Sequence, residues 1–132
     1  PSFLVQATII GVLAQRLVRR ICPNCREPFE IDTRELSSLG LDLGREGKLT
    51  LFRGRGCIRC RGTGYFGRSG ILEVLPFTES IKRLITAEAD QEAIRVQARR
   101  EGMVTLRENA VKKVLEGKTT YEEAIRVTWE QM

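Results

Sequence analysis

The sequence predicts an α-dominated α+β fold, in which a small cysteine-bearing module with short strands is followed by a helical bundle. Two C-x-x-C pairs, Cys22 with Cys25 and Cys57 with Cys60, lie in the first half of the chain. Glycines divide residues 21–75 into short runs, some of which alternate as strands do. After Pro76 the pattern becomes helical, with four successive helix-start signals. These observations divide the chain into ranges 1–20, 21–75 and 76–132.

Residues 1–20 predict a helix. Apolar side chains form a broad stripe at helical spacing: Leu4, Ile10, Leu13, Leu17 and Val18. Cys22-Pro23 should end this helix, because the residue before a proline avoids helical geometry. The segment falls short of the roughly 20 apolar residues of a membrane-spanning helix. The start of the sequence is apolar and has neither a methionine nor a basic leader. We therefore expect a fragment whose first helix is buried in a longer protein.

Residues 21–75 predict one short helix and two strands. Asp32-Thr33-Arg34-Glu35 resembles a capping box and should open a helix through Leu39. Residues 48–53 alternate weakly, and residues 71–75 predict a strand buried on both sides. The dense glycines between these two runs favour tight turns over regular structure.

Residues 76–132 predict four short helices. Thr78 and Asp90 are candidate caps of the first two, and Gly102 should end the second. Capping boxes beginning at Thr105 and Thr119 predict the other two, with Gly117 between them. Four short capped helices in succession predict a compact bundle.

The four cysteines predict one structural zinc site with Cys22, Cys25, Cys57 and Cys60 as its ligands. Each C-x-x-C turn lets two sulfurs converge on a metal about 2.3 Å away, and two such turns complete a tetrahedron. Four protein ligands leave no open coordination position for catalysis. An iron site uses similar ligands and stays open as an alternative. Disulfides and a thioredoxin-like redox pair are weaker interpretations, because the chain has neither a secretory signal nor a βαβ pattern.

The charge is concentrated near the cysteines. The formal net charge is +5, with 12 Lys/Arg against 7 Asp/Glu in residues 1–75 and ten of each in residues 76–132. Five arginines lie close in sequence to the cysteines: Arg20, Arg26, Arg55, Arg59 and Arg61. They would compensate a four-thiolate zinc centre, which is formally 2−, or bind a partner, and both interpretations stay open.

The sequence carries no catalytic signature. It contains no G-x-x-x-x-G-K-[ST] phosphate loop and no histidine, the usual general base. We therefore expect no catalytic residues, no nucleotide-binding residues and no ATP hydrolysis by this chain alone.

Several stretches resemble the C-terminal part of the type II secretion and type IV pilus assembly ATPases. The resemblance covers almost the whole chain and rests on Ala14-Gln15-Arg16-Leu17-Val18-Arg19-Arg20-Ile21-Cys22-Pro23-Asn24-Cys25, on Gly56-Cys57-Ile58-Arg59-Cys60, on Gly62-Thr63-Gly64-Tyr65-Phe66-Gly67-Arg68-Ser69-Gly70-Ile71-Leu72-Glu73, on Gly102-Met103-Val104-Thr105-Leu106-Arg107 and on Gly117-Lys118-Thr119-Thr120 with Glu122-Glu123. It implies that residues 1–20 are the last helix of a RecA-like motor domain, followed by the zinc module and the bundle. Arg16 and Arg19 match the family's Ala-Gln-Arg-Leu-Val-Arg element and are candidates for a subunit interface, or they simply end the helix.

The resemblance implies a parent protein that is an ATP-hydrolysing motor, with ATP and Mg²⁺ bound upstream of this chain. The parent would be a cytoplasmic homo-hexamer, peripheral to the inner membrane through its docking partners in a secretion or pilus machine. Nothing in the sequence separates secretion from pilus assembly. Two other functions stay open: a nucleic-acid-binding zinc ribbon, which the neutral helical half disfavours, and a DnaJ-like zinc module, which needs further C-x-x-C-x-G-x-G repeats.

Overall fold

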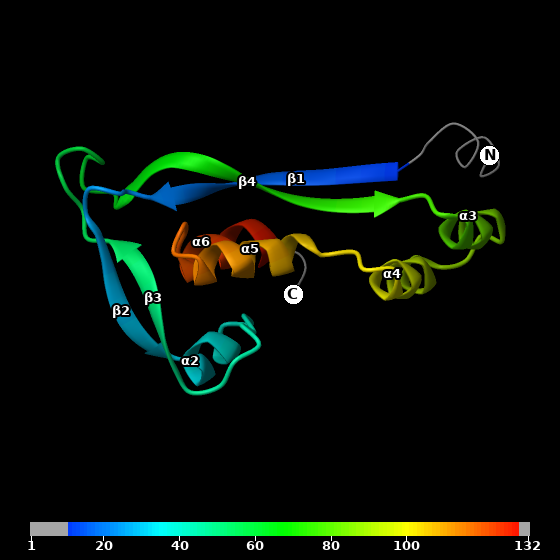
Figure 1. The fold of residues 1–132 in the computed structure, drawn as a ribbon, viewed down its shortest axis with the longest axis horizontal. Coiled ribbons are helices and arrows are strands. Elements are labelled where there is room, and N and C mark those ends of the chain that lie inside the picture. The colour runs from blue at the N-terminus through cyan, green and yellow to red at the C-terminus, as the bar shows by residue number, and fades with distance from the viewer. Residues whose placement is uncertain (1–10, 130–132) are drawn as a thin grey trace. The chain divides into compact units, whose positions relative to one another are not determined.

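A computed structural model describes residues 11–129, which form two compact units. The first unit contains residues 11–15 and 72–105, and the second contains residues 16–71 and 106–129. Two two-stranded sheets and five helices occur in the described residues, in the order β1 (Gly11–Ile21), β2 (Arg26–Asp32), α2 (Thr33–Ser38), β3 (Lys48–Gly54), β4 (Tyr65–Pro76), α3 (Glu79–Thr86), α4 (Gln91–Arg100), α5 (Leu106–Leu115) and α6 (Tyr121–Thr128) (Figure 1). The predicted α+β class is confirmed, although strands occupy nearly as much of this part of the chain as helices do.

The prediction of a helix over residues 1–20 is wrong for residues 11–20, which belong to strand β1 paired with β4. Residues 2–10 of the predicted helix lie outside the described residues. The expected stripe does not form a buried face, because Leu13 and Leu17 are 60% and 47% exposed. Of this stripe, Val18 is buried, as is Ile21 beyond it, and both are β-branched residues that favour strands. Pairing with β4 gives the backbone N–H and C=O groups of β1 their hydrogen-bond partners. This segment therefore forms a strand despite the helical spacing of its apolar residues.

The glycine-rich region is also more regular than predicted. Strand β4 runs through Gly67 and Gly70, where the glycine density favoured turns. Its later part is not buried on both sides, because Leu72 and Val74 are 43% and 48% exposed. Strand β2 pairs antiparallel with β3, from Arg26 opposite Gly54 to Asp32 opposite Lys48. This sheet positions both C-x-x-C turns, since Cys25 directly precedes β2 and Cys57 follows β3.

The predicted helix starts are largely confirmed. The side chains of Asp32, Thr78, Asp90 and Thr120 each accept a hydrogen bond from a backbone N–H in the first turn of the following helix. Helix α5 begins directly after Thr105, as expected, whereas the cap of α6 is Thr120, one residue after the predicted Thr119. Gly102 and Gly117 have φ angles of +94° and +76°, the left-handed conformation with which helices commonly end.

The four C-terminal helices pack in two pairs, and the compact bundle expected for residues 76–132 stays a prediction. Helices α3 and α4 pack together in the first unit, around the fully buried Ile81. Helices α5 and α6 pack together in the second unit, where α5 also contacts β3. The second unit's core includes Leu36, Leu41, Leu51, Ile71 and Val114. Cap signals predict where helices start but not which helices pack together.

Helix α6 is tied to β1 by a buried carboxylate. The Glu123 side chain is 1% exposed, and its two oxygens accept hydrogen bonds from the Arg19 backbone N–H (2.7 Å), Arg19 Nη2 (2.9 Å), Arg126 Nε (2.7 Å) and Arg126 Nη2 (2.9 Å). The Arg19 guanidinium also lies over the Tyr65 ring, 4.1 Å from its centroid. The Tyr65 hydroxyl in turn is 2.7 Å from Thr120 Oγ1. The network joins β1, β4 and α6 within the second unit.

Replacing Glu123 with glutamine is expected to lower the free energy of unfolding by about 2 kcal/mol at neutral pH, because the charge-assisted hydrogen bonds are lost. Burial opposes ionisation, but hydrogen bonds from Arg126 and Arg19 outweigh it and lower the pKa of Glu123 from 4.5 to about 2. The carboxylate therefore stabilises the fold fully above about pH 4.5, and this contribution is lost as the pH falls toward 2. Denaturant titrations between pH 4.5 and about 2 should show that the free energy of unfolding falls more steeply for the unsubstituted chain than for E123Q.

Glu116→Gln is the matched control. Glu116 pairs with Lys118 at 3.8 Å, and its side chain is 40% exposed. Such a surface pair contributes roughly 0–1 kcal/mol. Equal destabilisation by the two substitutions, or the same pH dependence in all three proteins, would contradict a structural role for Glu123.

Candidate metal centre

The structure brings the four predicted ligands to one point. Cys22, Cys25, Cys57 and Cys60 are free thiols, and their Sγ atoms all lie within 4.8 Å of one another. The Sγ–Sγ distances are 3.8 Å for Cys22 to Cys57, 3.8 Å for Cys25 to Cys60 and 3.7 Å for Cys57 to Cys60. A tetrahedron of sulfurs about 2.3 Å from a metal has edges of about 3.8 Å. The four sulfurs are therefore spaced to hold one metal ion.

Each C-x-x-C turn is held by the element beside it. Cys25 lies directly before β2, where Arg55 N donates to Cys25 O at 3.0 Å. Cys22 follows β1, and its backbone N–H donates to Gly64 O at 2.9 Å. Cys22, Cys25 and Cys60 are buried and Cys57 is partly buried, so the sulfurs form a small core of their own.

N–H groups point at the sulfurs. Gly56 N donates to Cys25 Sγ at 3.3 Å, and Gly56 has a φ of +103°, a conformation that favours glycine. Cys57 N and Gly64 N both donate to Cys60 Sγ at 3.2 Å, and Asn24 Nδ2 donates to Cys57 Sγ at 3.2 Å. Such donors stabilise the negative charge of a thiolate, the form in which cysteine binds metal.

The thiol pKa values reflect these contacts. Burial raises the pKa of Cys25 to about 11, partly offset by the Gly56 N–H. Burial also opposes ionisation of Cys60, but the N–H groups of Cys57 and Gly64 outweigh it and lower the pKa to about 6. The hydrogen bond from Asn24 lowers the pKa of Cys57. The low pKa of Cys60 makes that sulfur ionise readily, whereas the raised pKa of Cys25 means that its thiol needs a nearby cation to become a thiolate.

The arginines near the cysteines have several partners. Arg26 lies 3.6 Å from the Phe52 ring centroid and donates to Gly117 O at 3.1 Å, and Arg59 lies 4.8 Å from the Phe66 ring centroid. Arg19 binds Glu123 as described above, and Arg16 lies on the exposed side of β1. Neither Arg16 nor Arg19 is brought into the cysteine cluster. Sequence reasoning missed Asn24 and Gly64 as sulfur donors, although Asn24 lies between two ligands and Gly64 in a glycine-rich turn.

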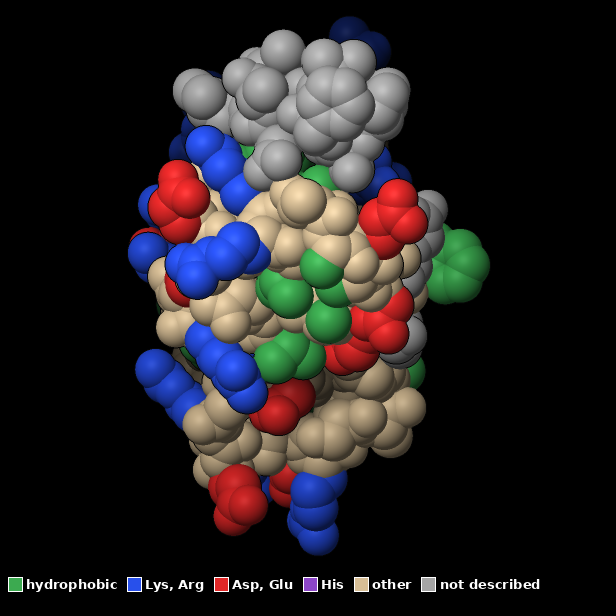
Figure 2. Space-filling view, turned by 90° about the vertical axis from the view of Figure 1, so that its right-hand side faces the viewer, with side chains coloured by type: hydrophobic (Ala, Val, Ile, Leu, Met, Phe, Trp, Pro, Cys, Tyr) green, Lys and Arg blue, Asp and Glu red, His purple; other side chains and the backbone are tan. Residues whose placement is uncertain are grey.

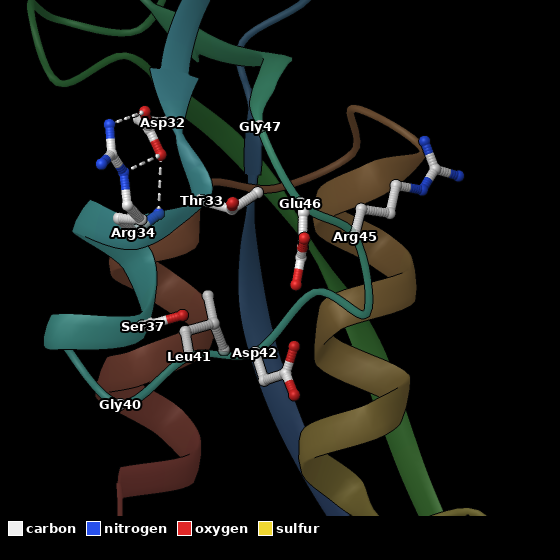
Figure 3. Close-up of a pocket in the computed structure, with 10 residues that line it drawn as sticks. All are labelled: Asp32, Thr33, Arg34, Ser37, Gly40, Leu41, Asp42, Arg45, Glu46 and Gly47. Atoms are coloured by element: carbon white, nitrogen blue, oxygen red, sulfur yellow. Dashed lines mark hydrogen bonds and ion pairs between the residues drawn. The ribbon is translucent and has the colours of Figure 1, made fainter.

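An open cavity of about 820 Å³ lies elsewhere in the second unit, between α2 and the loop that follows it (Figure 3). Its polar side chains already make local contacts. Asp32 pairs with Arg34 at 3.1 Å, and Asp42 accepts a hydrogen bond from Gly44 N at 2.8 Å. We assign no ligand to this cavity.

Four convergent sulfurs, supported by N–H donors and carried on two C-x-x-C turns, define a candidate four-sulfur metal site. The chain belongs to the Type II/IV secretion system protein family, whose family model matches residues 1–126.

Known relatives agree with this assignment. The chain is 43% identical over 129 residues to type II secretion system protein E of Pseudomonas aeruginosa, covering 98% of this chain and 25% of that protein. It is 44% identical over 128 residues to the type IV pilus assembly ATPase PilB of Thermus thermophilus, covering 97% of this chain and 14% of that protein. It is 39% identical over 128 residues to the type II secretion system ATPase E of Vibrio cholerae, covering 97% and 25%. The chain therefore spans a quarter or less of the length of these relatives.

Proposed function

We propose that this chain is the zinc-stabilised C-terminal module of a cytoplasmic ATPase that powers type II protein secretion or type IV pilus assembly. Its role is subunit packing and docking to the inner-membrane machinery. The observation that carries the proposal is the convergence of four sulfurs at the spacing of a tetrahedral site. Family membership supplies the setting, because relatives of this chain are named as ATPases of both systems.

Zinc fits the donor set best. It accepts four thiolates in a tetrahedron without a ligand-field preference, and four protein ligands leave no position for substrate. Bound there, zinc would supply cross-linking of the two turns and no chemistry of its own. Iron in the same four thiolates is the alternative, which metal analysis distinguishes.

The parent protein would supply the motor. ATP and Mg²⁺ would bind in the part of the relatives' length that this chain does not cover, and the parent would assemble as a homo-hexamer. Arg16 remains a candidate subunit-interface residue. Arg19 is a candidate as well, but its bond to the buried Glu123 supports a role within the chain.

A nucleic-acid-binding ribbon is the other function considered. The face shown in Figure 2 carries both acidic and basic side chains around a small hydrophobic patch. In the sequence, residues 76–132 hold ten Lys/Arg against ten Asp/Glu, whereas a stripe of one sign is the usual footprint of nucleic-acid binding. This neutral half and the family assignment favour the secretion or pilus role. None of the helices in residues 11–129 has both the length and the hydrophobicity needed to traverse a lipid bilayer.

The functional test uses the parent protein carrying the paired substitutions Cys25→Ser and Cys60→Ser. Loss of the metal site is expected to reduce secretion or pilus assembly at least about tenfold, in line with a structural metal whose binding energy is folding energy. Thr63→Ser, next to the second turn, is the control and should leave the output unchanged. The isolated 132-residue chain should show no ATP turnover above background.

Two results would contradict the proposal. One is normal secretion or pilus assembly by the cysteine variant with its metal site confirmed empty. The other is ATP hydrolysis by the purified chain that survives removal of contaminating ATPases and falls with variants of this chain.

A further inference from the structure

The four cysteines of the candidate metal site differ in how far solvent reaches them. Cys22, Cys25 and Cys60 are 0%, 7% and 5% exposed, whereas Cys57 is only partly buried. The residue that follows Cys57 in the second C-x-x-C turn, Ile58, is 98% exposed. Cys57 therefore lies on the solvent side of the cluster, and a reagent dissolved in water meets it before the other three cysteines.

A second sulfur lies next to Cys57 in the same turn. Cys57 Sγ is 3.7 Å from Cys60 Sγ and 3.8 Å from Cys22 Sγ. Cys22 is fixed at the end of β1, where its backbone N–H donates to Gly64 O at 2.9 Å. Cys60 is only three residues from Cys57, and C-x-x-C is a spacing at which redox proteins form disulfides. Linking Cys57 to Cys60 thus leaves β1 in place, which makes Cys60 the better partner.

A disulfide within this turn and a four-sulfur metal site exclude each other. Sulfurs that bind one metal in a tetrahedron lie about 3.8 Å apart, close to the 3.7 Å between Cys57 and Cys60. A disulfide bond is about 2.05 Å long, so the two sulfurs would have to leave their places in the tetrahedron. Cys22 and Cys25 alone then offer two ligands, half of what a structural zinc ion needs.

We propose that Cys57 is a site of oxidation by hydrogen peroxide, and that its disulfide with Cys60 empties the metal site. The inference rests on the proposed function, because it takes the four sulfurs to hold zinc. Cys57 Sγ attacks one peroxide oxygen, so that an S–O bond forms, the O–O bond breaks and hydroxide leaves. Cys60 Sγ then attacks the sulfenic sulfur, the S–S bond forms and the second hydroxide leaves.

The two steps balance without any further reactant. The two sulfurs together lose two electrons, the two peroxide oxygens gain them, and both hydroxides take up protons from the buffer. A disulfide is reduced by thiols, whereas the sulfinic acid formed by further oxidation is not. Oxidation of Cys57 would therefore act as a reversible form of metal removal, with Cys60 protecting it from irreversible damage.

The test treats the zinc-loaded, reduced full chain with hydrogen peroxide and follows free zinc with a chromogenic chelator. Zinc should be released as peroxide is consumed. Peptide mass spectrometry after alkylation should then find Cys57 joined to Cys60, with Cys22 and Cys25 still as thiols. Dithiothreitol with added zinc should restore the loaded chain. In the absence of peroxide, a limiting amount of iodoacetamide should label Cys57 first.

Asn24→Ala tests the reacting sulfur. Asn24 Nδ2 donates to Cys57 Sγ at 3.2 Å, and this bond draws negative charge away from the sulfur that attacks peroxide. Its loss should speed peroxide-dependent zinc release about fivefold, the factor that one hydrogen bond typically contributes. Asn109→Ala on α5, at the only other asparagine of the chain, is the matched control and should leave the rate unchanged. Zinc release without peroxide is subtracted, so that a site that is merely looser does not imitate the effect.

Four results would overturn the inference: zinc that stays bound in excess peroxide, a disulfide between the two turns, first labelling of another cysteine, or equal rates for Asn24→Ala and Asn109→Ala. The zinc content before treatment separates the two proposals. A chain without zinc contradicts the proposed function, whereas a zinc-loaded chain that resists peroxide contradicts only the oxidation of Cys57.

Discussion

Removing the metal from this chain is expected to unfold the region around the two C-x-x-C turns. Metal binding contributes on the order of 10 kcal/mol to the folding of small zinc modules, more than a domain of this size can readily replace. The buried cluster at the turns consists of Cys22, Cys25 and Cys60, with Cys57 packed against it, so metal loss would remove the bonds that hold the two turns together. Hydrogen exchange after chelation should show lost protection at the amides of Gly56 and Gly64, which donate to sulfur.

The expected response is local to one unit. Helices α3 and α4 belong to the first unit and should keep their protection, whereas α5 and α6 share the second unit with the cysteines and should lose part of theirs. Cys57→Ser should reproduce the effect, and chelator should have little further effect on it. A chelator already saturated with zinc is the control. Unchanged exchange in a chain shown to be metal-free would contradict a structural role for the metal.

Gly54→Ala is expected to destabilise the second unit by about 3 kcal/mol or more, because the added methyl group overlaps backbone that cannot move freely. A Cβ at Gly54 would meet the carbonyl oxygen, Cα and carbonyl carbon of Gly64. Gly64 in turn donates to Cys60 Sγ and accepts from Cys22 N, so it links the two C-x-x-C turns. Displacing Gly64 should therefore lower metal affinity as well as stability.

Gly44→Ala controls for the loss of glycine itself. Gly44 has a φ of +72°, but a Cβ there meets nothing within 4 Å. Its replacement should cost only roughly 1 kcal/mol of backbone strain and should leave metal affinity unchanged. Thermal unfolding and competition for zinc with a chelator of known affinity measure both quantities. Equal effects of the two alanines on zinc affinity would contradict the close packing of Gly54 against Gly64.

Local signals in the sequence predicted local structure well. The caps at Asp32, Thr78 and Asp90 act through hydrogen bonds within one turn, so they can be recognised without knowing the rest of the fold. Pairing across the chain could not be recognised in that way. Strand β1 carries apolar residues at three- and four-residue intervals, which fit a helix until β4 supplies its hydrogen-bond partners.

Strand β2 was missed for a related reason. It contains Pro28, which lacks an N–H and argues against a strand, but in a two-stranded sheet every strand has an open edge where proline is tolerated. Along β2, Glu27, Phe29 and Ile31 are less exposed than the residues between them, and this alternation is seen only in the structure, where β2 pairs with β3.

Some residues of the candidate site could be predicted from the sequence, and others could not. The four ligands could be predicted because C-x-x-C spacing is a local device for directing two sulfurs to one point. The sulfur donors Asn24 and Gly64 depend on how the two turns meet, and the spacing does not encode that. Glu123 gave no signal, since a glutamate in the first turn of a helix is ordinary, and only the arrival of Arg19 from β1 makes it a buried ion pair.

The central claim is that Cys22, Cys25, Cys57 and Cys60 together hold one zinc ion. The most direct measurement is elemental analysis of the purified, reduced chain, followed by replacement of the metal with Co²⁺ and recording of its absorption spectrum. The account predicts one zinc per chain, and intense visible absorption with thiolate-to-cobalt charge transfer, as a tetrahedral four-sulfur site gives. Both signals should be lost in Cys57→Ser. A chain that is folded and fully reduced yet free of metal, or a cobalt spectrum typical of oxygen and nitrogen ligands, would contradict it.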